Sequence, residues 1–233
     1  MPERGTRPSA ADALVPAPGA PAGAAAAAAS GTASRPAVSP AAATTAWLGA
    51  FLGRPGIAVI AGTGSVAVGG SSGALERVGG HGYLVGDEGS GYWMGKMALR
   101  AALAAAEGSG SPTRLGDALT EAAGASLDEL VLRVQRSPRD RTVLTGLAPV
   151  VGRCAGQPDQ DPVAVSIVAE AAAALAGLAG ALRRRLGELP VAGVGGVFAM
   201  WPLWTAFQHA TGAVPPLAPP EVGAALLAAG LDG

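Results

Sequence analysis

The distribution of apolar and polar positions changes near residue 46. Residues 1–46 contain eighteen Ala and seven Pro but only four large apolar side chains. Ordering a backbone costs about 1–2 kcal/mol per residue, and a segment with so few large apolar side chains cannot offset that cost by burial. The pattern predicts a disordered Ala/Pro-rich tail over residues 1–46 and a folded domain over residues 47–233.

Short apolar runs in the folded part predict strands. Gly56–Ala61 is a β-branched run of the length typical of a buried strand. The turn Gly62–Ser65 follows it, and Val66–Val68 returns as a second strand. Two further strands are predicted at Glu76–Val78 and Pro190–Val194.

Capping residues predict where the helices begin. Ser90 is suited to cap a helix over about residues 91–106, and Ser126 stands at the capping-box spacing from Glu129. Asp161 and Pro162 open a long helix that reaches about Leu186. Further helices are predicted over residues 138–154, from residue 201, and over residues 220–229.

Composition and charge exclude several classes of protein. A formal net charge of −1 provides no field for holding a polyanion, so nucleic-acid binding is not expected. The single cysteine, Cys154, excludes an internal disulfide framework and any iron–sulfur cluster held by this chain alone. No run of large apolar residues is long enough to predict a transmembrane helix. Cys154, Trp201, Trp204 and Phe207 lie in helical patterns that favour core positions.

The turn after the first strand is a candidate anion site. Gly62, Thr63, Gly64 and Ser65 place two glycines in a tight bend, which leaves backbone N–H groups unshielded. Such donors can converge on a phosphate oxygen, and the two hydroxyls add further donors. The alternative interpretation is a plain hairpin turn, because short glycine motifs also arise by chance.

A second glycine-rich stretch carries a carboxylate. Gly80 and Gly82 flank His81, so a small ligand could approach the backbone there. Asp87 stands just ahead of the helix capped by Ser90, where a carboxylate is expected to stay ionised. An ionised carboxylate can accept two sugar hydroxyls at once. The alternative is that Asp87 caps the helix and His81 only fills a loop.

A third motif follows the last predicted strand. Gly195, Gly196 and Val197 form a strand–turn–helix connection where a nucleotide base or ribose could lie against bare backbone. A turn that lets helix and strand pack closely explains a single Gly-Gly pair about as well.

In this order and spacing, the motifs resemble the N-acetylglucosamine kinase family, also called the BadF/BadG/BcrA/BcrD-type ATPase family, of the actin-like/hexokinase/Hsp70 superfamily. The resemblance runs from about Trp47 to Asp232. It implies an α/β, ribonuclease-H-like lobe: a mixed sheet flanked by helices, bordering a cleft. It further implies a cytoplasmic enzyme that transfers the γ-phosphoryl group of ATP, with Mg²⁺, to the 6-hydroxyl of N-acetylglucosamine or a related amino sugar.

The resemblance also implies roles for the three motifs. The turn from Gly62 to Ser65 would be the second phosphate loop. The sugar pocket would be lined by Gly80, His81, Gly82 and Asp87, and the adenosine would face Gly195, Gly196 and Val197.

The sequence departs from the family pattern at its N-terminal side. The acidic glycine-rich first phosphate loop has no counterpart, and no Asp or Glu occurs between Asp12 and Glu76. The family's catalytic aspartate would align near Ala43, so no catalytic and no metal-ligating residue is assigned. His81 stands where the family often has a tryptophan. The chain is therefore expected to represent the C-terminal lobe, with an exposed lobe face that favours self-association.

Three functions remain open on the sequence. The first is an N-acetylhexosamine kinase-like protein. The second is an ATPase activator of the BadF/BcrA type, in which cysteines from two subunits hold an iron–sulfur cluster. The third is a non-catalytic module that binds sugar or nucleotide.

Overall fold

The sheet has four strands in the order β3–β2–β1–β4. The computed structural model describes residues 39–71, 74–156 and 158–230, and the predicted tail over residues 1–38 lies outside these ranges. β1 pairs antiparallel with β2 and parallel with β4, and β2 pairs antiparallel with β3. The strands are β1 (Gly56–Ala61), β2 (Ser65–Ser71), β3 (Ala74–Gly79) and β4 (Val191–Val194). All four predicted strands are confirmed, and β2 and β3 extend beyond their predicted ends.

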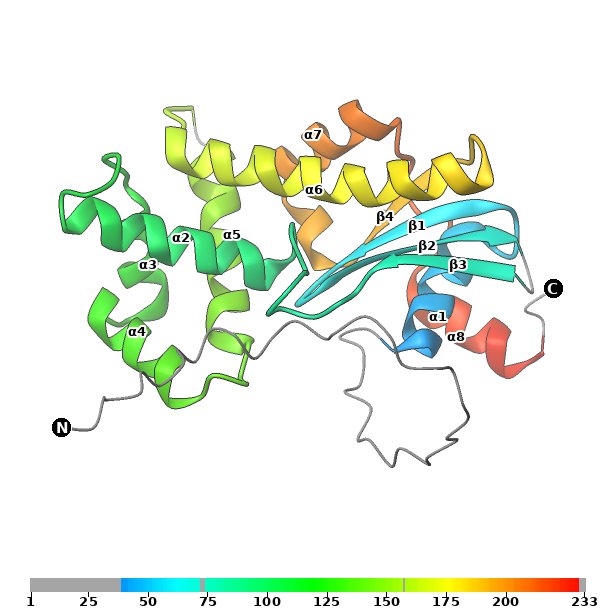
Figure 1. Cartoon of the computed structure of the whole chain (residues 1–233), viewed down its shortest axis with the longest axis horizontal. Helices are drawn as coiled ribbons and strands as arrows, with labels where there is room; N and C mark the ends of the chain where they lie inside the picture. Colours follow the sequence, from blue (N-terminus) through cyan, green and yellow to red (C-terminus); the bar gives the residue numbers. More distant parts are fainter. Residues whose placement is uncertain (1–38, 72–73, 157, 231–233) are drawn as a thin grey trace, which may run out of the picture. The chain divides into compact units, whose positions relative to one another are not determined.

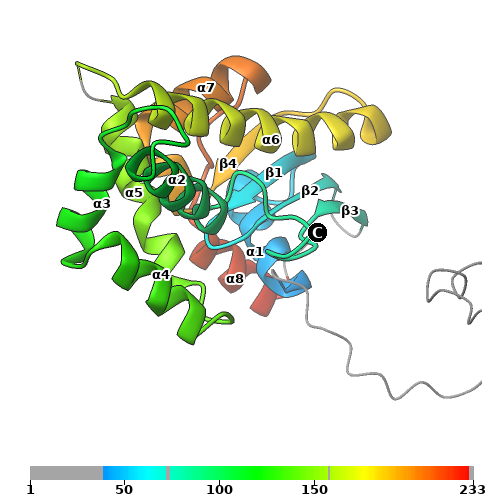
Figure 2. The same ribbon diagram turned by 60° about the vertical axis from the view of Figure 1, so that its left-hand side comes forward.

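Helices cover both faces of this mixed sheet. The long helix α6 lies along one face, and α1 and α8 lie together on the other (Figures 1 and 2). The side chains of β1 alternate accordingly: Ile57 and Val59 join the larger hydrophobic core, whereas Ala58 joins the smaller one beneath α1. The helices in chain order are α1 (Pro40–Phe51), α2 (Gly91–Ala106), α3 (Leu115–Ala123), α4 (Leu127–Arg136), α5 (Thr142–Gly156), α6 (Pro162–Leu186), α7 (Trp201–Thr211) and α8 (Pro220–Ala228), with a 3₁₀ turn η1 (Gly196–Ala199) before α7.

Helix α1 corrects the predicted boundary of the tail. The helix begins at Pro40, with Ser39 as its N-cap, so residues 40–46 belong to the folded domain. Ala43 and Ala46 are buried against the sheet. A Cβ on Gly223 of α8 would lie 2.0 Å from the carbonyl oxygen of Thr45. Small residues let these helices approach closely, and an alanine-rich pattern does not distinguish such packing from disorder.

Helices α2 to α5 form a cluster at one end of the sheet (Figure 1). The predicted N-caps Ser90 and Ser126 are confirmed, and the capping box of α4 is complete. Helix α5 starts at Thr142, later than predicted. The Asp140 carboxylate accepts hydrogen bonds from both the N–H and the hydroxyl of Thr142, the first residue of the helix.

Helix α6 is the one helix within the described ranges that is long and apolar enough to cross a membrane by length and composition. Its apolar side chains include Ile167, Leu175 and Leu182, which are buried in the larger core. The helix also contacts α5, α7 and three strands of the sheet. It is thus packed as the core helix of a globular domain.

Candidate active site

Two of the predicted glycine turns lie side by side. They follow β1 and β4, which are neighbouring parallel strands with Ile60 paired to Val194. A Cβ on Gly195 would lie 2.4 Å from the carbonyl oxygen of Ala61, so only glycine permits this approach. The carboxyl ends of parallel strands are the place where α/β sheets bind ligands. The loop at 62–65 and the turn at 195–196 therefore face the same edge of the sheet.

The loop at 62–65 is held by internal hydrogen bonds. The Gly62 N–H donates to the Gly64 carbonyl oxygen at 3.0 Å, and the Gly91 N–H of α2 donates to the Gly62 carbonyl oxygen at 2.7 Å. The Ser65 hydroxyl donates to the Glu88 carbonyl oxygen at 2.8 Å. Ser65 therefore positions the loop, whereas Thr63 is exposed at its tip, where its N–H and hydroxyl can meet a ligand.

Asp87 packs directly against this loop. Its Oδ1 accepts a hydrogen bond from the Ser65 N–H at 3.3 Å. A Cβ on Gly64 would lie 2.8 Å from Oδ2, so the second glycine of the turn makes room for the carboxylate. Asp87 has a φ of 63°, which is uncommon for a residue other than glycine. The structure thus brings the predicted phosphate loop and the predicted sugar-binding carboxylate into contact.

The electrostatics of Asp87 differ from the expectation. The helix is capped by Ser90 and not by Asp87, whose side chain is 0% exposed. Burial raises the pKa of Asp87, although the Ser65 N–H and the Arg141 guanidinium oppose the shift. The pKa shift is thus opposite in direction to the one expected from a helix N-terminus, because desolvation is its largest cause. Oδ2 has no hydrogen-bond partner within the described part of the chain, and the nearest cation is Arg141 Nη1 at 3.7 Å.

A cavity of about 390 Å³ adjoins Asp87. Among the residues predicted to bind the sugar, Gly80, His81 and Asp87 line this cavity, whereas Gly82 does not. The neighbouring loop exposes Leu84 and Val85 almost fully. The cavity is also lined by residues that the sequence did not single out, among them Val78, Ala174 and Leu178.

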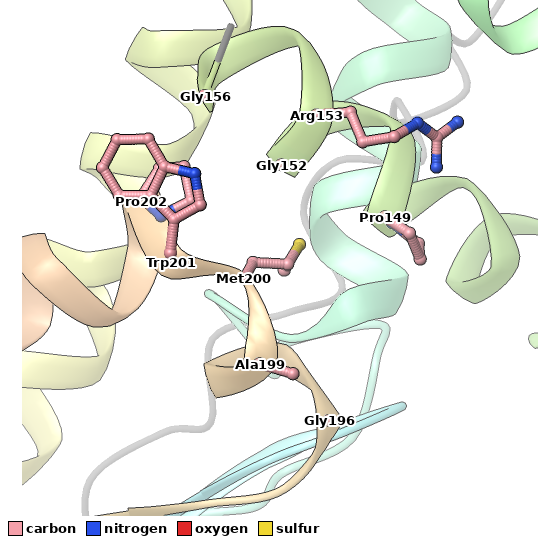
Figure 3. Close-up of a pocket in the computed structure, with 9 residues that line it drawn as sticks. All are labelled: Pro149, Gly152, Arg153, Gly156, Gly196, Ala199, Met200, Trp201 and Pro202. Atoms are coloured by element: carbon pink, nitrogen blue, oxygen red, sulfur yellow. The ribbon is translucent and has the colours of Figure 1, made fainter.

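A larger cavity of about 590 Å³ opens beside Gly196. Figure 3 shows it between α5 and the start of α7, with the Trp201 indole on one side and the Met200 side chain pointing toward Gly152. Trp201 is 59% exposed, which corrects its predicted core position, whereas Phe207 is buried as expected. The Val197 side chain is buried in the larger core, so only its backbone can face a ligand.

Sequence reasoning missed the contribution of α5 to both sites. Arg141 approaches Asp87, and Pro149, Gly152 and Arg153 line the larger cavity. These residues carry no recognisable motif. The i, i+4 spacing of Thr145, Pro149 and Arg153 was the available signal, because it places these three on one face of α5, with Arg141 just before the helix begins.

Two of the glycine turns leave open space beside the backbone. A Cβ on Gly62 or Gly196 would meet no atom within 4 Å, so the backbone is open to a ligand at both turns. Within residues 39–71, 74–156 and 158–230, no group of three or more His, Cys, Asp or Glu side chains could hold a metal ion.

A mixed sheet with glycine turns at the ends of neighbouring parallel strands, flanked by helices, places this chain in the actin-like ATPase class of folds. A profile of the BadF/BadG/BcrA/BcrD ATPase family matches residues 28–228, and the chain belongs to that family. The expected family and fold are both confirmed. No curated protein matches the chain.

Two solved structures are similar in fold to this chain. The protein assigned as an N-acetylglucosamine kinase in Chromobacterium violaceum is similar at a TM-score of 0.69 and 31% identity, over 80% of this chain and 64% of that chain. A protein with the same assignment in Porphyromonas gingivalis has a TM-score of 0.62 and 23% identity, over 78% of this chain and 62% of that chain. This chain therefore spans less than two thirds of the length of either.

A ROK family glucokinase from Streptomyces griseus, solved with glucose and AMPPNP, is similar in fold. Its TM-score is 0.51 at 17% identity, over 80% of this chain and 66% of that chain. At this identity the likeness establishes the fold alone.

Proposed function

We propose that this chain binds a nucleoside triphosphate and an amino sugar next to each other, as part of an ATP-dependent sugar phosphotransferase. One observation carries the proposal: the contact between the loop at 62–65 and Asp87, with Oδ1 of the carboxylate 3.3 Å from the Ser65 nitrogen. Phosphoryl transfer requires the two substrates to lie within a few ångströms of each other, so the phosphate loop and the sugar-binding group must adjoin.

The nucleotide would extend along the sheet edge from the loop at 62–65 to the cavity beside Gly196. Open backbone at Gly62 and Gly196 would accommodate the phosphates and the ribose. The exposed indole of Trp201 offers an apolar surface to a base. Mg²⁺, bound through the phosphate oxygens of the nucleotide, supplies neutralisation of the phosphate charge.

The sugar would occupy the cavity at Asp87. Oδ2 is buried without a hydrogen-bond partner in the described part of the chain, and a pair of sugar hydroxyls would supply the missing donors. N-acetylglucosamine or a related amino sugar, phosphorylated on its 6-hydroxyl, is the proposed substrate. The support for this identity is the family membership together with the 31% identity to the C. violaceum protein.

Calorimetry tests both halves of the site. ATP with Mg²⁺, N-acetylglucosamine and glucose are titrated separately into the full chain, and ADP release is then followed in a coupled assay. We expect binding of ATP and stronger binding of N-acetylglucosamine than of glucose. Asp87→Asn should weaken sugar binding and leave ATP binding within about twofold, because the amide keeps one acceptor but loses the charge.

The outcomes separate the alternatives. ADP release that depends on the sugar would establish the phosphotransferase. Binding of both ligands without ADP release would leave a non-catalytic sensor, and binding of neither would refute the proposal. The iron–sulfur activator is disfavoured by Cys154, which is 5% exposed within the core and whose pKa burial raises.

Two further expectations remain predictions. Self-association would be detected by light scattering as a mass above that of one 22.5 kDa chain. A cytoplasmic location would be checked by cell fractionation.

A further inference from the structure

One face of α5 connects the two cavities. Thr145, Pro149, Arg153 and Gly156 follow one another at intervals of three or four residues, so they lie along the same side of α5, and Arg141 directly precedes the helix. Pro149, Arg153 and Gly156 line the 590 Å³ cavity beside Gly196. Arg141 at the other end reaches the Asp87 carboxylate. The helix therefore runs alongside the whole proposed path of the nucleotide.

Thr145 sits in the middle of this path with unused hydrogen-bonding groups. Its Oγ1 is buried without a partner among the residues that the structure describes. Its Cγ2 lies 3.2 Å from the Cβ position of Gly91, whose N–H donates to the Gly62 carbonyl oxygen. Pro149 has no N–H, so the Thr145 carbonyl also lacks its usual helical donor. Unpartnered buried polar atoms are rare in folded proteins and point to a ligand.

Arg141 lies beside Asp87 but donates no hydrogen bond to its carboxylate. The distance from Nη1 to Asp87 Oδ2 is 3.7 Å, which is longer than a hydrogen bond. The guanidinium carbon lies 5.7 Å from the centre of the Tyr83 ring, and Tyr83 packs edge-on against Tyr92 at 5.2 Å. The aromatic pair fixes the position of the guanidinium, while its donors stay available to a further acceptor.

We propose that Arg141 and Thr145 form an oxyanion-binding pair that contacts the terminal phosphate of the bound nucleoside triphosphate from the side opposite the loop at 62–65. This inference rests on the proposed function and adds two residues to it. A phosphate beside the buried Asp87 carboxylate would be repelled without a cation between them. Arginine suits that position, because its planar fork binds phosphate through two parallel hydrogen bonds.

The pair would exchange partners when substrates bind. In the free protein Arg141 balances the charge of Asp87 at 3.7 Å. Sugar hydroxyls would take over Oδ2, and the guanidinium would turn its donors to the phosphate oxygens. Thr145 Oγ1 would donate to the same phosphate, which satisfies its missing partner.

The test compares a triphosphate with a monophosphate. Dissociation constants for ATP and AMP, each with Mg²⁺, are measured by calorimetry on the full chain and on Thr145→Val, Arg141→Lys and the control Arg139→Lys, an exposed arginine two residues away. Thr145→Val should weaken ATP binding about 5- to 10-fold and Arg141→Lys about 10-fold, with AMP binding changed less than about twofold. Arg139→Lys should change neither.

Thr145→Val also separates a ligand role from a structural one. Valine keeps the shape of the side chain and removes an unpartnered hydroxyl, so the melting temperature should stay the same or rise while ATP affinity falls. A lower melting temperature with an unchanged ratio of ATP to AMP affinity would overturn the inference, and this holds even if Arg141→Lys folds poorly. If the unmodified chain binds neither nucleotide, the proposed function fails first and this inference with it.

Discussion

Two aspartates of this chain are almost equally buried and yet differ in nearly every other respect. Asp87 is 2% exposed and Asp161 is 3% exposed. The Asp161 carboxylate accepts hydrogen bonds from two N–H groups of its own helix, Val163 and Ala164, and from the Thr113 hydroxyl and the Arg114 N–H across the chain. Oδ1 of Asp87 accepts a hydrogen bond from the Ser65 N–H, and Oδ2 accepts none within the described residues.

The pKa shifts of the two groups run in opposite directions. Burial by itself would raise the pKa of Asp161, but hydrogen bonds from Ala164, Arg114, Thr113 and Val163 outweigh it, and the pKa is lowered. Burial raises the pKa of Asp87, and the Ser65 N–H, the Arg141 guanidinium and the Gly82 N–H do not compensate. A buried carboxylate whose lone pairs are all used is structural, whereas one left with a free oxygen is poised for a ligand.

The largest effect on stability is expected from substitution of Asp161. Asp161→Ala removes the cap of α6 and leaves buried donors from two segments without an acceptor, so unfolding free energy should fall by about 3 kcal/mol. Urea denaturation measures it. Stability equal to that of the unmodified chain would show that the hydrogen bonds to Asp161 contribute nothing.

Substitution of Asp87 should affect ligand binding more than stability. Asp87→Asn is expected to change stability by less than about 1 kcal/mol, because few hydrogen bonds are lost. Sugar affinity should fall about 10- to 100-fold, since hydrogen bonds to a charged acceptor are the strong ones. Calorimetry with N-acetylglucosamine measures this fall. A large stability loss with unchanged sugar affinity would make the two aspartates equivalent and remove the contrast.

Asp87 and Asp161 should also have opposite effects on the pH dependence of stability. Because the pKa of Asp87 is raised in the folded state, its contribution to stability is present below the ordinary value of 3.8 and is lost as pH rises through the raised pKa. Asp161 contributes stability above 3.8 that is lost as pH falls through its lowered pKa. Asp87→Asn should therefore gain stability relative to the unmodified chain as the pH rises above 3.8.

For Asp161→Asn, the stability deficit should shrink as the pH is lowered below about 4. Urea titrations at several pH values report both differences. Parallel curves for the two variants would contradict the opposite shifts.

The smallest effect is expected at Gly195 and Gly196 after β4. One of these glycines is packed against the protein and the other faces open space. A Cβ on Gly196 would meet nothing within 4 Å. Gly196→Ala should therefore fold normally and weaken ATP binding by about threefold, through one methyl group in the proposed path of the nucleotide. Gly195→Ala is the matched control: with a φ of 114° and the Ala61 carbonyl oxygen at 2.4 Å, it should lower stability instead. Equal behaviour of the two variants would argue against an open site at Gly196.

Local signals predicted most of the elements. The caps at Ser90, Ser126 and Asp161 act within one helical turn, so they can be recognised from neighbouring residues. The start of α1 could not be predicted in this way. Ala43 and Ala46 become core residues because α1 packs against the sheet, and the close approach of α1 to Gly223 of α8 is likewise a contact between distant segments.

The sequence by itself determined the strands, the capped helices and the three glycine motifs, because each depends on the conformational preferences of a few adjacent residues. Only the tertiary structure decided that the turns at 62–65 and 195–196 share one sheet edge, that Asp87 is desolvated, and that Arg141 lies beside Asp87. These relations join residues tens of positions apart, and the burial and charge that set the chemistry of Asp87 come from those distant neighbours.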